Sequence, residues 1–244
     1  MIRRAENTGP SRGRGGRHLP FAIVLLFALG MSGCGLDSVV YTNIPAPTFS
    51  YSGGSLFLQD QGGVDTSLLG HTYVFLGYQI LYRIYDTSDA AASASNAISV
   101  LASSGQSPDT VYSQLTTSNK LVPLYFSNID TSESVLPATS SDNSGVSFLI
   151  STSNWSVTKS SGTFPTGSVV AYRNYTGSLS GRKTSFVTPD RDIKSGDSDY
   201  AGASDDPSSP YVVMCAVGIA SIDIFNHYYS LPMLLQNGPL TLGN

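Results

Sequence analysis

Charged residues are scarce in this chain: they make up 12% of its 244 residues, and glutamate occurs only as Glu6 and Glu133. Residues 34–244 hold eight Lys or Arg against sixteen Asp or Glu, which gives this part a formal charge of −8. A nucleic-acid-binding protein needs a basic surface to replace the counterions of the phosphates. The charge balance therefore excludes that class.

Long apolar runs and cysteine are also scarce. Residues 21–31 form an apolar run of eleven residues, whereas a helix that spans a membrane needs about 20. Five arginines and no lysine precede this run, and Cys34, one of only two cysteines, follows it closely. A positive stretch, a short apolar segment and small residues together predict an export signal.

The sequence Met31-Ser32-Gly33-Cys34 resembles the lipobox of bacterial lipoproteins, in which an aliphatic and two small residues precede the cysteine. The resemblance implies that residues 1–33 are a signal peptide, that lipid is attached to Cys34, and that 34–49 form a tether. Membrane lipid would then be a partner, and the cell envelope the location. Gly35 favours the outer membrane, on its periplasmic or surface face. An uncleaved signal anchor and an ordinary secretory signal are the alternatives.

Gly, Ser, Thr, Asp and Tyr dominate the rest of the chain, which is the composition of strands and turns. The clearest strand is 72–85, where Gly77 predicts a bulge. One face of it would carry Tyr78, Ile80, Tyr82 and Ile84. Residues 211–220 read as a strand that is apolar on both faces, with Cys215 as a core residue. A closing strand is expected at 228–235.

Two short helices are expected between these strands, at 90–102 after a cap at 87–89 and after Ser107-Pro108-Asp109, with Val111 and Leu115 packing inward. Further strands are expected at 55–59, 121–126, 146–151, 153–158, 168–173 and 182–187. The polar residues 189–210, with six aspartates, predict a surface loop.

Two separated segments resemble a fibronectin type III or immunoglobulin-like domain. Residues 77–83 are similar to its third strand, and 211–222 with 229–232 to its closing strand pair. The resemblance implies a mainly β fold: a single antiparallel β-sandwich over 50–244, with a large insertion at about 86–210 that contains one or two short helices and extra strands. The combination is also similar to poorly characterised spirochaete lipoproteins.

Catalytic motifs are missing. Only His71 and His227 follow the leader, and no G-x-S-x-G motif exposes a nucleophile. We therefore expect no enzyme activity and no cofactor, with an envelope hydrolase that uses one of these histidines as the alternative.

Two weaker binding candidates remain. Carboxylate oxygens suit calcium, which makes a set of loop aspartates candidate ligands, although the D-x-D-x-D-G pattern is absent and a solvated loop is favoured. These residues are Asp190, Asp192, Asp197 and Asp199. Trp155 is a candidate for stacking on a glycan or an envelope protein. The sequence thus predicts a membrane-anchored cell-envelope lipoprotein that acts as a binding or structural module for an unidentified ligand.

Overall fold

The computed structural model divides the chain by its contacts into Met1–Val40 and Tyr41–Asn244. The described residues all belong to the second unit: 44, 46–52, 55–58, 67–68, 71–72, 74–126, 135–137, 146–150, 155–159, 169–175, 185–187, 190–221, 227–235 and 238–242. The expected signal peptide and Cys34 lie outside them. The sheets, helices and cores are therefore those of the second unit alone.

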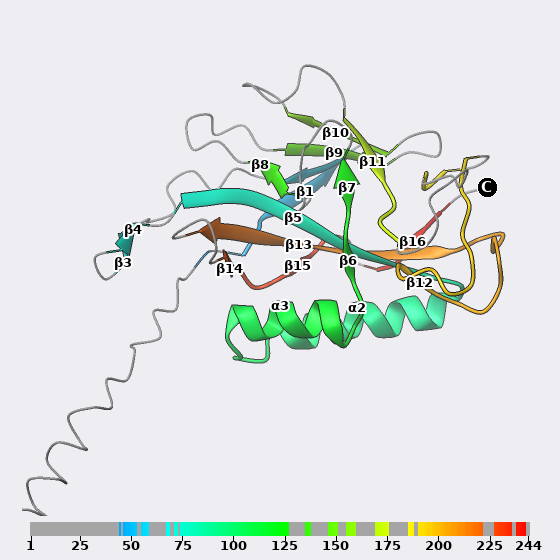
Figure 1. The fold of residues 1–244 in the computed structure, drawn as a ribbon, viewed down its shortest axis with the longest axis horizontal. Helices are drawn as coiled ribbons and strands as arrows, with labels where there is room; N and C mark the ends of the chain where they lie inside the picture. Colours follow the sequence, from blue (N-terminus) through cyan, green and yellow to red (C-terminus); the bar gives the residue numbers. More distant parts are fainter. Residues whose placement is uncertain are drawn as a thin grey trace, which may run out of the picture. The chain divides into compact units, whose positions relative to one another are not determined.

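Two long antiparallel strands, β5 (Val74–Tyr85) and β13 (Tyr211–Ser221), form the centre of this unit (Figure 1). Their pairing runs from Tyr211 opposite Tyr85 to Ser221 opposite Val74, with a register shift between Ile219 and Ala220. Gly77 lies at that shift with a φ of 138°, a conformation that side chains other than glycine rarely adopt. The predicted bulge is confirmed.

Six shorter strands complete an eight-stranded sheet around this pair. Three pair with β5 and three pair with successive parts of β13. They are β6 (Val122–Pro123), β8 (Val135–Pro137), β12 (Tyr200–Ala201), β14 (His227–Tyr229), β15 (Met233–Leu234) and β16 (Leu240–Thr241). The closing strand expected at 228–235 is thus two short strands, interrupted around Pro232, which has no N–H for a ladder.

A second, six-stranded sheet is antiparallel throughout, in the order β1-β2-β9-β10-β11-β7. Its strands are β1 (Phe49–Ser52), β2 (Ser55–Leu58), β7 (Tyr125–Phe126), β9 (Val146–Ile150), β10 (Trp155–Lys159) and β11 (Val169–Tyr172). A small pair, β3 (Ser67–Leu68) and β4 (His71–Thr72), stands apart from both sheets. The described part of the strand expected at 182–187, residues 185–187, is not a strand.

Two helices, α2 (Ser88–Ala102) and α3 (Pro108–Thr117), lie on one side of the central pair (Figure 1). The hydroxyls of Thr87 and Ser107 cap them by accepting from N–H groups three residues on. Val111 and Leu115 are buried, so both predicted helices are confirmed.

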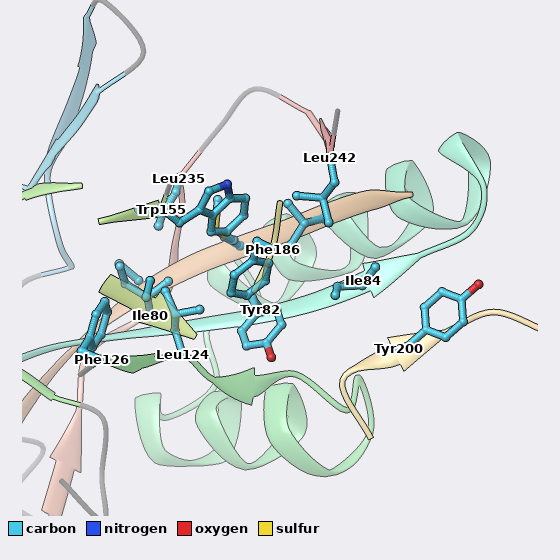
Figure 2. Packing of buried hydrophobic residues seen from close by; sticks show 14 of the residues in the cluster. Ile80, Tyr82, Ile84, Leu124, Phe126, Trp155, Phe186, Tyr200, Leu235 and Leu242 are labelled. Atoms are coloured by element: carbon cyan, nitrogen blue, oxygen red, sulfur yellow. The ribbon is translucent and has the colours of Figure 1, made fainter. Parts of the chain in front are cut away.

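The alternation along β5 and β13 divides the interior into two cores. Leu81, Tyr85, Val213, Cys215 and Val217 pack with the helices. Tyr78, Ile80, Tyr82, Ile84, Val212, Met214 and Ala216 pack on the opposite face, with residues of the six-stranded sheet (Figure 2). The mainly β fold is confirmed, and the central sheet lies between a helical layer and a second sheet.

Candidate functional site

A buried arginine, Arg173, directly follows β11 and is 2% exposed. Its Nε donates to Oδ2 of Asp199 at 2.9 Å, and its Nη2 donates to Oδ1 of the same carboxylate at 2.7 Å. Nη2 also donates to Oδ2 of Asp197 at 2.9 Å, and Nη1 donates to the carbonyl of Asp192. This two-pronged geometry is the strong form of an arginine–carboxylate pair.

Tyr82 connects this group to β5. Its hydroxyl donates to Oδ2 of Asp199 at 2.6 Å and accepts from the N–H of Asn174 at 2.6 Å. The N–H of Lys194 donates to Oδ2 of Asp197 at 2.9 Å. We call Tyr82, Arg173, Asp197 and Asp199 the arginine cluster; it joins β5, the end of β11 and the segment 190–206.

Aspartates also shape the segment 190–206 from within. Asp206 accepts from the N–H of Ile193 at 2.7 Å, and Asp205 accepts from the N–H of Ser195 at 2.8 Å. In irregular backbone, such carboxylates accept the N–H hydrogen bonds that a neighbouring strand would accept in a sheet. Gly202 allows the ring of Tyr200 to fold back, because a Cβ at this position would stand 2.1 Å from its hydroxyl oxygen. Polar side chains of the segment 190–206 therefore help to fix its backbone conformation.

Burial governs the electrostatics of the arginine cluster. Desolvation, reinforced by the negative charge of Asp199, raises the pKa of Tyr82 well above its usual value. Burial alone would lower the pKa of Arg173, but its bonds to Asp199 and Asp197 outweigh that effect and raise the pKa. Tyr82 stays neutral and Arg173 stays charged, so the cluster holds one cation between two carboxylates.

This arrangement suits a clamp. Each charged group of the cluster binds another member of it, and removal of one partner would leave an uncompensated buried charge. On the outer side, Nζ of Lys194 lies 2.6 Å from Asp206 and 3.2 Å from Asp192. That side chain is 39% exposed, and ion pairs this exposed contribute little.

The four candidate calcium ligands do not act as a set. Asp197 and Asp199 are 6% and 0% exposed and bind Arg173, so the expectation of a solvated loop is wrong for these two. Asp192 pairs with Lys194, and Asp190 is exposed. Within the described ranges, no group of three or more His, Cys, Asp or Glu side chains is placed to hold a metal ion.

Trp155, the candidate for glycan or partner binding, is 3% exposed. Its ring stacks on Phe186 with centroids 4.1 Å apart, inside the core between the sheets (Figure 2). The hypothesis that it binds a ligand at the surface is therefore wrong. Its position in β10 faces the central sheet, which requires a large apolar side chain.

The remaining candidates are dispersed. His71 lies in β4 and His227 in β14, two strands that belong to different sheets. Cys215 is completely buried, and this burial raises the pKa of its thiol to about 12. The prediction that Cys215 is a core residue is confirmed.

Sequence reasoning missed the arginine cluster. The available signal was a single arginine directly after the apolar Val169–Tyr172, because a cation at the end of a buried strand needs a buried partner. Its partner Asp199 lies 26 residues further on, in a segment whose six aspartates look alike in sequence. Only the fold distinguishes the two buried carboxylates from the exposed ones.

Comparisons give no family for the chain. In the part that the structure describes, no helix has the length and apolar character needed to span a bilayer. No protein-family model matches the chain, and no curated protein or solved structure is significantly similar to it.

Proposed function

We propose that this protein is a lipid-anchored cell-envelope protein that acts as a binding or structural module and not as an enzyme. The observation that carries the proposal is the segment 21–34, where an apolar run of signal-peptide length ends at Cys34 behind five arginines. Lipid on Cys34 would be the membrane contact. Two or more acyl chains give stable anchoring, which one chain does not.

The start of the folded unit is compatible with such an anchor. Ile44 is buried, and it stands ten residues after Cys34. Ten residues span at most about 36 Å when fully extended. A body held this way stays close to the lipid surface, which is suitable for presenting a surface or joining an envelope assembly.

A non-enzymatic role is supported by the state of the buried charges. The arginine cluster binds its own members and fixes the segment 190–206 to β5. A general base or nucleophile would need partial exposure and a neighbour that activates it.

Metabolic labelling with a fatty acid tests the proposal. We expect the full chain, produced in a bacterial host, to incorporate label and to float with membranes. The Cys34→Ala variant should lose both properties, whereas Cys215→Ala, the matched control at the other cysteine, should keep them. An unlabelled wild-type chain would end the proposal. Separation of inner and outer membranes tests the expected outer-membrane location.

An immunoglobulin-like origin of the central sheet is part of the same proposal. Its support is the adjacent antiparallel order β5-β13-β14, which is the order of the third, sixth and seventh strands in such sandwiches. The helices then belong to the insertion between β5 and β13. An experimental structure in which β14 is not paired with β13 would contradict this origin.

A further inference from the structure

Ile44 occupies a built position on the central sheet. It is 2% exposed and clusters with Ala220, Phe75 and Tyr228. Beneath it lies Gly218, where a Cβ would stand 3.2 Å from Cγ2 of Ile44 and 3.2 Å from Cε2 of Phe75. The missing side chain of Gly218 therefore leaves room for Ile44. We call Phe75, Gly218, Ala220 and Tyr228 the tether socket.

The tether socket marks one end of the central pair, where β5 begins and β13 ends. The other end carries β12 and the segment 190–206; β12 and β14 lie toward opposite ends in Figure 1. The 12 residues of β5 extend over about 36 Å at the usual rise of a strand. The fold thus separates the socket end from the acidic end by nearly the whole length of the sheet.

The two ends differ in charge. The described strand residues at the socket end, 74–78, 218–221 and 227–230, include no Asp, Glu, Lys or Arg, and they include aromatic residues. One acid contacts them: Oδ1 of Asp109, in α3, accepts from the N–H of Tyr229. The segment 190–206 has six aspartates; Asp197 and Asp199 are buried against Arg173, which leaves four aspartates against Arg191 and Lys194. Tyrosine and other aromatic side chains suit the interface between lipid and water. Anionic lipids give the membrane a negative surface potential that attracts basic segments. The same potential repels an acidic surface.

We propose that the tether socket orients the protein on the membrane: Ile44, seated on Gly218, turns the less acidic socket end toward the lipid surface and the acidic end away from it. This inference rests on the proposed lipid at Cys34. With Ile44 seated, the tether between anchor and socket has nine residues, 35–43. Release of residues 44–48 would lengthen it by five residues, or about 17 Å. The partner is an anionic phospholipid surface.

Nitroxide labels at the two ends test this orientation. The full lipidated chain carries either His227→Cys or Ser195→Cys, and the buried Cys215 is not labelled. Vesicles contain phosphatidylethanolamine, phosphatidylglycerol and a lipid with a nickel-chelating headgroup. The relaxation caused by headgroup nickel should be several-fold larger for the label at 227 than for the label at 195. Equal values, or a larger value at 195, would overturn the inference.

A second variant connects the orientation to the socket. Ile44→Ser should unseat the tether and reduce the difference between the labels several-fold, whereas Val40→Ser, the matched change four residues earlier, should preserve it. A difference that survives Ile44→Ser would overturn the role of the socket. Flotation separates the two proposals. Failure of the wild-type chain to float overturns both lipidation and orientation, whereas floating protein with equal label signals overturns orientation alone.

Discussion

The two ends of the central sheet are stabilised by different kinds of interaction. At the socket end, Ile44 lies on a glycine among Phe75 and Ala220, and the contact is apolar. At the acidic end, Arg173 is held between two buried carboxylates. Apolar contacts lose stability gradually as atoms are removed. A buried ion cluster is stable only while every partner is present, because a charge left alone cannot be solvated.

This contrast gives each end a suitable role. The apolar socket holds the end of the tether through the side chain of Ile44, and Pro47, three residues further on, is also buried. The arginine cluster joins Tyr82 of β5 to Arg173 after β11 and Asp199 of the segment 190–206, residues far apart in the sequence. Loss of the cluster would therefore loosen three parts of the fold together.

The largest expected effect is at the acidic end. Arg173→Met keeps most of the side-chain volume but leaves Asp197 and Asp199 buried without their cation, so the free energy of unfolding should fall by about 3–5 kcal/mol. Urea unfolding measures this loss. Lys194→Met, which removes an exposed cation from the same segment, is the control and should cause a much smaller loss. Similar losses for the two variants would show that the arginine cluster does not clamp these parts of the fold together.

The socket end should respond less strongly. Ile44→Ala removes a buried side chain and should lower the free energy of unfolding by about 2 kcal/mol, the lower limit for such truncations. The value is low because Ile44 stands near the start of the folded unit, where neighbours can close the cavity. Ile44→Val, with one methylene fewer, should cost about 1 kcal/mol. Both changes are measured by urea unfolding, and no loss for Ile44→Ala would mean that the socket is empty in solution.

Sequence reasoning succeeded where the signal is local. The alternation in β5, the caps at Thr87 and Ser107, and the bulge at Gly77 each depend on neighbours a few residues away. The two-sided burial of β13 followed from its apolar run, although the sequence did not indicate that helices cover one of its faces.

Sequence reasoning failed where the interacting residues are far apart along the chain. Trp155 was considered as a weak candidate for binding a glycan or a partner, because nothing near it in sequence reveals Phe186, the ring on which it stacks. The two buried aspartates were taken for solvated ones, since burial in the segment 190–206 is decided by Arg173 from another strand. Ile44 was assigned to a free tether because its socket comes from β5 and β13.

A smaller change at the acidic end tests how strongly the cluster depends on one hydrogen bond. Tyr82→Phe removes the hydroxyl that donates to Oδ2 of Asp199. We expect a loss of about 1.5 kcal/mol, the lower limit for a bond to a charged group, because Arg173 still donates to both carboxylate oxygens. Thermal and urea unfolding measure it. A loss as large as that of Arg173→Met would mean that Tyr82, and not Arg173, holds Asp199.

The smallest expected effect concerns the middle of the sheet, where Cys215 belongs to neither end. Burial raises the pKa of this thiol from 9.0 to about 12, so the folded protein keeps a proton that the unfolded chain releases. The unfolded state then binds fewer protons, and stability falls as the pH rises above the unfolded pKa; below it the thiol has no effect. Between about pH 9 and about pH 10, the wild type should lose about 1 kcal/mol to this thiol. Cys215→Ala should remove that slope. If stability changed with pH in the same way in the two proteins, the thiol would have to be in contact with water. That result would contradict the two-sided burial of β13, on which the separation of the two ends depends.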